Sequence, residues 1–158
     1  MRRMSTGFPN GLPFMKMHGL GNDFVVVDAR QGENPVTDAL ARGIADRHRG
    51  VGFDQLAVIG KPDDGAVRLT FYNADGSLSA ACGNATRCIA RYLMDESGDA
   101  TITLKTERGL LEARDEGRGL TSVNMLHPQL DWQEIPLAQE MDTLVLPIEG
   151  EPTATGMG

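Results

Sequence analysis

Apolar and polar positions divide the chain into short β-like stretches and two stretches with helical spacing. Stretches rich in β-branched and other apolar residues predict strands. The predicted strands span residues 14–17, 23–28, 55–59, 67–72, 101–106, 110–114 and 120–125. Nineteen glycines and eight prolines imply many turns, which favours a β-rich or mixed fold over a helix bundle. We therefore predict an α+β fold.

Apolar residues that recur at i, i+3, i+4 and i+7 predict two helices. The first begins near Asn34-Pro35, with Asn34 as its cap, and ends near residues 48–50. The second follows Gly83. The predicted apolar faces are Val36, Ala39, Leu40, Gly43 and Ile44 in the first helix, and Ala85, Cys88, Ile89, Tyr92 and Leu93 in the second.

The signal for a compact domain is strong as far as residue 125 and then weakens. Residues 1–13 have the composition of a flexible leader, and residues 14–123 form the predicted N-terminal domain. Residues 131–136 have the character of a loop and residues 144–148 that of one more strand. We expect residues 124–158 to begin a second domain that they do not complete.

Charge and hydropathy argue against two classes of partner. A formal net charge of −7 argues against nucleic acid, because binding to phosphates relies on clustered Lys and Arg. No basic amphipathic helix suggests a membrane surface, and no stretch approaches the roughly 20 apolar residues of a membrane span. The residues after Met1 lack the apolar core of a secretory signal. The expected location is therefore cytoplasmic, and the expected partner is a small molecule.

The segment from Asn73 to Cys88 carries the candidate chemistry. A strand ends at Asn73, the turn Asn73-Ala-Asp-Gly-Ser77 reverses the chain, and Cys82 comes immediately before a helix. A helix N-terminus has unpaired N–H groups and partial positive charge, so it can stabilise a thiolate and bind a carboxylate. Gly83 would let a ligand approach closely, and Asn84 would cap the helix or donate to the ligand.

The helix terminus is expected to lower the pKa of the Cys82 thiol only modestly. It contributes about 0.3–1 kcal/mol, and up to about 2 kcal/mol when partly buried; since one pKa unit corresponds to about 1.4 kcal/mol, the pKa would fall by about one unit from about 8.5. Cys82 therefore needs a second charge or an acid partner. The competing interpretation is a buried structural cysteine, but Cys-Gly-Asn at the start of a helix is a poor place for core packing. Cys88, on the apolar face, is expected to be a core residue.

Other site chemistries fit less well. Cys-x5-Cys is not a usual zinc spacing, and His18, His48 and His127 are isolated from one another. A dinucleotide loop needs a third glycine and a following helix, whereas a strand follows Gly19-Leu-Gly21-Asn22. We therefore predict no metal site. A tight turn accounts for these glycines but leaves Asn22 and Asp23 without an explanation.

Four segments together resemble the diaminopimelate epimerase family. They are Lys16-Met-His-Gly-Leu-Gly-Asn-Asp-Phe24, Asp46-Arg-His-Arg-Gly-Val-Gly-Phe-Asp-Gln55, Asn73-Ala-Asp-Gly-Ser77 and Ala81-Cys-Gly-Asn-Ala-Thr-Arg-Cys88. The resemblance implies a domain in which a mostly antiparallel sheet wraps around a central helix, here the helix after Cys82. It also implies an isomerase that interconverts L,L- and meso-diaminopimelate, in lysine and peptidoglycan precursor biosynthesis, without a cofactor or a metal.

The resemblance also implies roles for single residues. Cys82 matches one of the family's two catalytic cysteines, and the matches to its substrate contacts are Asn22, Gln55, Asn73, Gly83 and Asn84. Inversion of an α-carbon requires a proton to leave one face and another to arrive on the opposite face, which a thiolate and a thiol can accomplish together. Without a cofactor, fixed dipoles such as helix N-termini must stabilise the carbanion. The sequence leaves open whether the chain forms a homodimer.

The chain departs from the family pattern in two places. The family's second cysteine lies far downstream, and this sequence has no cysteine after Cys88. Leu126 stands where the family usually has glycine, in a segment that resembles the start of the second domain. We therefore expect a fragment that carries one of the two bases. Cys88 is not expected to substitute, because it would lie about one and a half turns inside the same helix.

Three alternatives stay open. The fold suits a related cofactor-independent racemase or isomerase, such as proline racemase or the phenazine-pathway isomerases, although the matched segments favour diaminopimelate. A non-catalytic, truncated substrate-binding module is a candidate of a different class. A thiol-redox role for Cys82 and Cys88 is the least favoured, because the spacing is not Cys-x-x-Cys. Reaction of Cys82 with a substrate-like electrophile would distinguish the epimerase from the redox protein.

Overall fold

The computed structural model describes residues 11–135 and 137–156. The chain divides into two compact units, a larger one that ends at Asn124 and a smaller one, Met125–Gly158. Most of the predicted leader, residues 1–10, lies outside the described residues. Leu12, which is described, packs against the apolar cluster between the sheet and the first helix.

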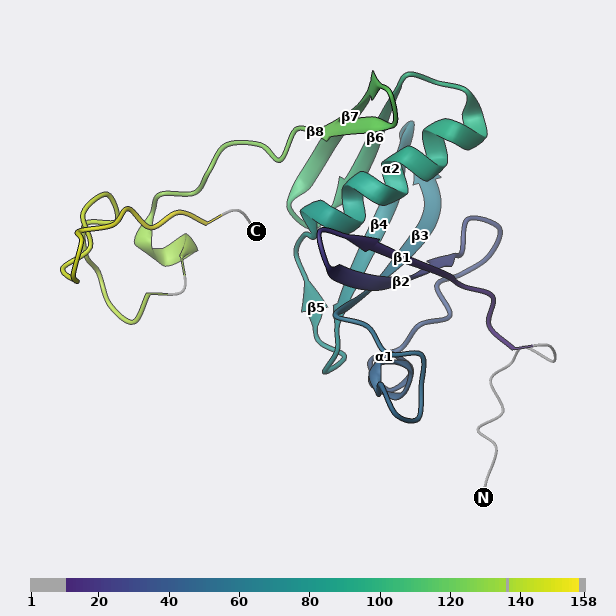
Figure 1. Ribbon diagram of the computed structural model, residues 1–158, viewed down its shortest axis with the longest axis horizontal. Coiled ribbons are helices and arrows are strands. Elements are labelled where there is room, and N and C mark those ends of the chain that lie inside the picture. Colours follow the sequence, from purple (N-terminus) through teal and green to yellow (C-terminus); the bar gives the residue numbers. More distant parts are fainter. Residues whose placement is uncertain (1–10, 136, 157–158) are drawn as a thin grey trace. The chain divides into compact units, whose positions relative to one another are not determined.

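One mixed sheet forms the frame of the larger unit (Figure 1). Across the sheet the order is β1 (Met15–Gly19), β2 (Asn22–Asp28), β3 (Gln55–Asp63), β4 (Ala66–Asn73), β6 (Thr101–Thr106), β7 (Gly109–Gly117) and β8 (Leu120–Val123). A short strand, β5 (Leu78–Ser79), pairs with β4. Among the described residues, five of the seven strand pairings are antiparallel.

The two parallel pairs explain where the helices lie. Parallel neighbours cannot be joined by a tight turn, so the chain crosses over between them, usually through a helix. Helix α1 (Asp38–Ala45) connects β2 to β3, and helix α2 (Gly83–Ser97) lies between β4 and β6. The predicted α+β fold, a mostly antiparallel sheet wrapped around a central helix, is therefore confirmed.

Strands β2 and β3 are buried on both faces. No residue of 24–27 or 56–59 is more than 1% exposed. Along each strand, alternate side chains pack against α2 on one face and against α1 on the other. Burial on both faces explains why these strands appear in the sequence as continuous apolar runs rather than alternating ones.

Helix α2 lies inside the curl of the sheet (Figure 1). Its buried residues are Ala85, Thr86, Ile89, Ala90, Leu93 and Met94. The predicted apolar face was therefore too narrow and partly wrong, because Cys88 and Tyr92 are only partly buried, at the edge of the cluster. The reason is that a curved sheet covers more of a helix than the single stripe that a flat one would cover. Gly98, in the left-handed conformation, ends the helix by donating its N–H to the carbonyl of Met94.

Helix α1 begins later than predicted. Thr37, not Asn34, is its N-cap, and the Thr37 hydroxyl accepts the N–H of Leu40 at 3.2 Å. Asn34 instead accepts the N–H of Val36 and donates to the hydroxyl of Tyr72 on β4. These contacts hold Asn34 in a turn before the helix, so its tertiary partner overrode its capping preference.

The buried side of α1 also differs from the prediction. Ala41 and Ala45 are its buried residues, whereas Ala39 and Gly43 are exposed. Val36, outside the helix, is buried. The helix thus faces the sheet with small side chains, which lets it lie close to β3 and β4.

The smaller unit has little regular structure among its described residues. A 3-10 turn spans Trp132–Glu134, and Gln129 forms an isolated bridge with Gly156. The strand predicted over residues 144–148 is wrong, because the chain turns back there: the N–H of Ile148 donates to the carbonyl of Leu146 at 2.8 Å. Whether this unit begins a second domain stays a prediction.

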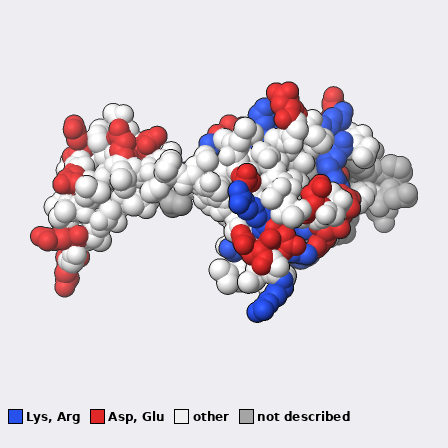
Figure 2. All heavy atoms as spheres, turned by 90° about the horizontal axis from the view of Figure 1, so that it is seen from above, with Lys and Arg blue, Asp and Glu red and all other residues white. Residues whose placement is uncertain are grey.

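Two features distinguish the smaller unit from the larger one. Residues 125–158 contain six acidic residues and no Lys or Arg, and Figure 2 shows only acidic colour there against mixed charge on the larger unit. Leu126, where the resembled family has glycine, has φ of +66°. That conformation favours glycine and is costly for a residue with a Cβ. This cost explains why the family usually has glycine at this position.

Among the described residues, no helix is both long and apolar enough to cross a membrane.

We expect the packing of α2 to dominate the stability of the larger unit. Ile89 is fully buried in the cluster between α2 and the sheet, so Ile89→Ala should lower the free energy of unfolding by about 2–5 kcal/mol. The matched control is Leu110→Ala, at a side chain that is 58% exposed, with an expected change within about 0.5 kcal/mol. Urea denaturation followed by circular dichroism measures both. Equal effects of the two substitutions would contradict this account of the core.

Candidate active site

Four of the predicted site residues lie at one end of the sheet and of α2. Asn22 is the first residue of β2, Gln55 the first of β3 and Asn73 the last of β4, and Cys82 immediately precedes α2. Because β2 and β3 are parallel and β4 is antiparallel to both, these strand ends meet at the same edge. Gln55 lies opposite Asn73 in the β3–β4 register.

Cys82 joins the start of α2 to the start of β2. It is the N-cap of α2, and its Sγ accepts the N–H of Ala85 at 3.4 Å. The same sulfur donates to Oδ1 of Asn22 at 3.7 Å. The capping role is therefore held by Cys82 and not by Asn84, whose Oδ1 accepts from Arg87 at 2.6 Å.

Burial, and not the helix terminus, dominates the titration of Cys82. The residue is only 9% exposed, and desolvation raises the pKa of its thiol above the ordinary value. The N–H groups of Ala85 and Asn84 oppose this effect but do not overcome it. The predicted lowering of this pKa is therefore wrong, because the surrounding core penalises the thiolate more than the helix start favours it. At neutral pH the resting group is a thiol, as its donation to Asn22 requires.

Gln55 and Asn73 form an amide cluster beside Cys82. Nε2 of Gln55 donates to Oδ1 of Asn73 at 3.3 Å and to Oγ of Ser79 at 3.4 Å. The hydroxyl of Ser79 donates in turn to the carbonyl of Ala81, the residue before Cys82. Ser79 was missed by sequence reasoning, because the two-residue strand that places it has no periodic signal of its own.

The Asn73-Ala-Asp-Gly-Ser77 turn holds the end of β4. The N–H of Asn73 donates to the carbonyl of Ser77, and Nδ2 of Asn73 donates to the Ser77 hydroxyl at 3.0 Å. Gly76 has φ of +84°, and a Cβ there would lie 2.5 Å from the carbonyl oxygen of Asp38. Glycine is therefore required at that position both for the turn and for its close contact with α1.

The β1–β2 turn lies against the start of α2. Leu20 and Gly21 both have positive φ, as a two-residue hairpin turn requires. A Cβ at Gly19 would lie 3.2 Å from the Cβ of Asn84, so glycine lets the turn approach the helix closely. This approach brings Asn22 to Cys82, although the two residues are 60 positions apart in the sequence.

A charged cluster that sequence reasoning left unassigned supports the same turn. Asp23 forms ion pairs with Lys16 at 2.6 Å and Arg47 at 2.7 Å, and Arg47 also pairs with Asp54 at 2.8 Å. Arg47 and Lys16 hold the pKa of Asp23 well below its usual range. The signal available in the sequence was the presence of all four residues within the two matched segments, 16–24 and 46–55.

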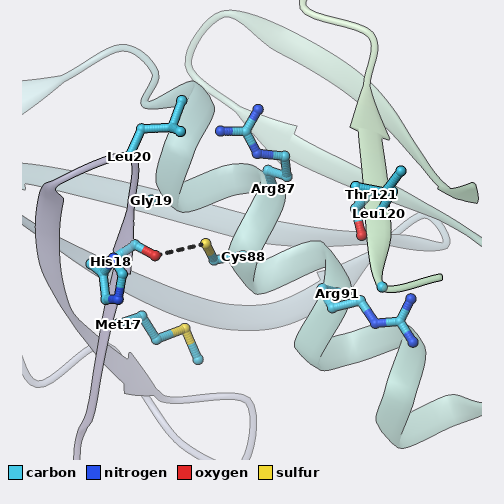
Figure 3. A pocket seen from close by; sticks show the side chains of 10 residues that line it. Met17, His18, Gly19, Leu20, Arg87, Cys88, Arg91, Leu120 and Thr121 are labelled. Carbon is cyan, nitrogen blue, oxygen red and sulfur yellow. Dashed lines mark hydrogen bonds between the residues drawn. The ribbon is translucent and has the colours of Figure 1, made fainter.

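Cys88 lines a separate cavity (Figure 3). The cavity has a volume of about 630 Å³ and lies between α2 and strands β1 and β8. Arg87, Cys88 and Arg91 reach it from α2, and the Cys88 sulfur donates to the carbonyl of His18 at 3.6 Å. Cys88 thus faces β1, and Cys82 is not among the residues that line this cavity.

The described residues contain no group of three or more His, Cys, Asp or Glu that could hold a metal ion.

The family model and the curated relatives that match this chain agree on one family. The family model for diaminopimelate epimerase matches residues 14–130. The diaminopimelate epimerase of Acidiphilium cryptum (strain JF-5) is 50% identical over 151 residues, which are 92% of this chain and 54% of that protein. That of Rhodospirillum centenum is also 50% identical over 151 residues, 92% of this chain and 52% of that protein. The chain thus spans about half the length of the curated relatives it matches.

A likeness among solved structures concerns the fold alone. A probable proline racemase from Agrobacterium radiobacter K84 superposes with a TM-score of 0.59 at 17% identity. The superposition covers 77% of this chain and 44% of the other.

The direction of the Cys82 pKa can be tested by alkylation in a Cys88→Ser chain, which leaves one thiol. Only the thiolate reacts, and burial disfavours it, so the rate should reach half its maximum at a higher pH than for a free thiol, which titrates near about 8.5. In concentrated urea the midpoint should return to the free-thiol value. Between the two midpoints the unfolded chain loses this proton and the folded chain keeps it, so Cys82 makes stability fall as the pH rises. A folded midpoint below the free-thiol value would mean that the helix start outweighs desolvation.

Proposed function

Because the chain belongs to the diaminopimelate epimerase family, we propose that it supplies one half of the active site of an isomerase that interconverts L,L- and meso-diaminopimelate. The observation that carries the proposal is that Cys82 caps α2 while its sulfur contacts Asn22 at the start of β2. A thiol at that position can exchange a proton with a substrate carbon, and the helix start beside it can receive a carboxylate.

In this proposal Cys82 acts as the acid in one direction and as the base in the other. As the resting thiol it delivers its proton to one face of the α-carbon after a base on the opposite face has removed the substrate proton. In the reverse direction it starts as the thiolate that the forward transfer leaves, and it takes the proton back from the α-carbon; burial disfavours that thiolate. The substrate therefore has to be held so that proton transfer occurs directly between carbon and sulfur, without water between them.

The polar residues at this edge of the sheet are the proposed substrate contacts. Gly83 and Asn84 lie at the start of α2, where backbone N–H groups and partial positive charge suit the α-carboxylate. The side-chain amides of Asn22, Gln55 and Asn73 can donate to carboxylate and accept from ammonium, which suits a substrate that carries both groups. Hydrogen bonds keep these amides oriented before a ligand arrives: Gln55 donates to Asn73, Asn73 donates to Ser77, and Asn22 donates to Asp54.

We infer that the second base corresponds to a group in the part of the relatives that this chain does not span. The sequence has no cysteine after Cys88. Cys88 lies further along the helix that Cys82 caps and donates to His18 on β1, so it is not directed at the opposite face of a substrate bound at Cys82. We further propose that the enzyme acts in the cytoplasm, in lysine and peptidoglycan precursor biosynthesis, and that it uses no cofactor. A homodimer stays a prediction.

The proposal can be tested by giving the chain the rest of an enzyme. In a chimera, residues 14–124 replace the matching part of the Acidiphilium cryptum relative, and α-proton exchange of L,L-diaminopimelate in heavy water is followed by NMR. We expect exchange with inversion, and we expect Cys82→Ser to lower the rate by about 100-fold or more, because it removes one of two acid–base groups. The matched control is Cys88→Ser on the same helix, which should stay within about threefold of the parent.

Two outcomes would contradict the proposal. A folded chimera that binds the substrate without exchange would favour the non-catalytic binding module. A chimera whose exchange survives Cys82→Ser would contradict the role of Cys82. The 158-residue chain alone, tested in parallel, should show no inversion, since Cys82 is the only one of its two cysteines that is proposed as an acid–base group.

A further inference from the structure

The side-chain amide of Asn22 lies between the carboxylate of Asp54 and the thiol of Cys82, and it contacts one with its NH2 group and the other with its oxygen. Its Nδ2 donates to Oδ2 of Asp54 at 3.3 Å, and its Oδ1 accepts from Sγ of Cys82 at 3.7 Å. An ionised carboxylate can only accept hydrogen bonds, so Nδ2 is the end of the amide that can face Asp54. The carbonyl oxygen must then face the sulfur.

Asp54 is itself held firmly in place. Its Oδ2 also accepts the N–H of Asp23 at 3.0 Å, and its own N–H donates to the carbonyl of Asp23 at 2.9 Å. Its Oδ1 pairs with Arg47 at 2.8 Å. Each oxygen of the carboxylate thus has a defined partner, and the carboxylate cannot rotate without breaking one of these contacts.

Asp54 belongs to a cluster in which carboxylates and cations are paired. Arg47 bridges Asp54 and Asp23, and Lys16 on β1 pairs with Asp23 from the other side. Two cations therefore balance two carboxylates.

We propose that Asp54 is a positioning residue for the acid–base group: it orients the amide of Asn22 so that the carbonyl oxygen holds the hydrogen of the Cys82 thiol. The proposal rests on the proposed function, since it assigns a role within the same site. A carbonyl oxygen accepts from a thiol but repels a thiolate, whereas an amide N–H would do the reverse. The amide orientation that Asp54 imposes on Asn22 therefore keeps the proton on the sulfur of Cys82 until the substrate arrives.

The experiment measures the protonation of Cys82 directly. In the full 158-residue chain carrying Cys88→Ser, the pH midpoint of Cys82 alkylation by iodoacetamide is compared with and without Asp54→Asn. Cys88 is removed because its charge interacts with that of Cys82. An asparagine at position 54 offers an oxygen as well as an N–H, so Asn22 is free to turn its Nδ2 toward the sulfur. We expect the midpoint to fall by about one pH unit.

The chain offers a matched control at the other end of β3. Asp63 has a side chain that is 40% exposed, against 45% for Asp54, and it pairs with Arg68 and Lys105. Asp63→Asn thus removes one negative charge from the opposite end of β3 without touching Asn22, and it should leave the midpoint unchanged. Asp54→Glu, which keeps an acceptor-only group, should stay closer to the parent than Asp54→Asn.

A second background shows whether the effect passes through Asn22. In an Asn22→Ala chain, Asp54→Asn should no longer move the midpoint. The proposal is overturned if Asp54→Asn leaves the midpoint in place, if Asp63→Asn moves it equally, or if the shift persists without Asn22. Thermal unfolding of each variant confirms that folded chains are compared. Because alkylation needs no substrate, an inactive chimera would refute the proposed function and leave this result standing.

Discussion

The burial of α2 inside the curled sheet is the contact on which the rest of the larger unit depends. Ala85, Ile89 and Leu93 pack against apolar side chains from β2, β3, β4 and β6. Helices of this length gain most of their stability from such packing and not from intrinsic propensity. The same packing sets where the first turn of α2 lies, and therefore where the sulfur of its capping residue, Cys82, is held.

At Cys82 the two consequences of that packing oppose each other. The helix start offers N–H groups that favour a thiolate, while the surrounding core removes the water that would solvate one. A helix terminus contributes about 0.3–1 kcal/mol, and burial can shift a pKa by several units. A thiol that stays protonated in the resting state suits an acid–base pair, since one member of such a pair must hold a proton while the other accepts one.

The sheet order explains why the polar groups gather at one edge. The β2–α1–β3 crossover makes β2 and β3 parallel, which brings Asn22 and Gln55 to the same end, and the antiparallel β4 returns Asn73 to it. The charged cluster around Asp23 and Asp54 lies where the two parallel strands begin. Asp54, a member of this cluster, accepts a hydrogen bond from Asn22, and Asn22 in turn accepts one from the sulfur of Cys82. The ion pairs therefore help to hold the side chain that contacts the sulfur.

The sequence by itself determined the elements, because periodicity, apolar runs and turn chemistry are local properties. It predicted both helices, every longer strand of the sheet and the turn at Gly76, and the order of its motifs indicated the family. It misplaced the cap of α1, where Asn34 has a distant partner in Tyr72, and it predicted a strand at residues 144–148, where the chain forms local turns instead. Only the tertiary structure decided the contact between Asn22 and Cys82, 60 residues apart, and the raised pKa of the thiol. The first depends on strand order and the second on how much of the core surrounds the sulfur, and neither property belongs to any short segment of the chain.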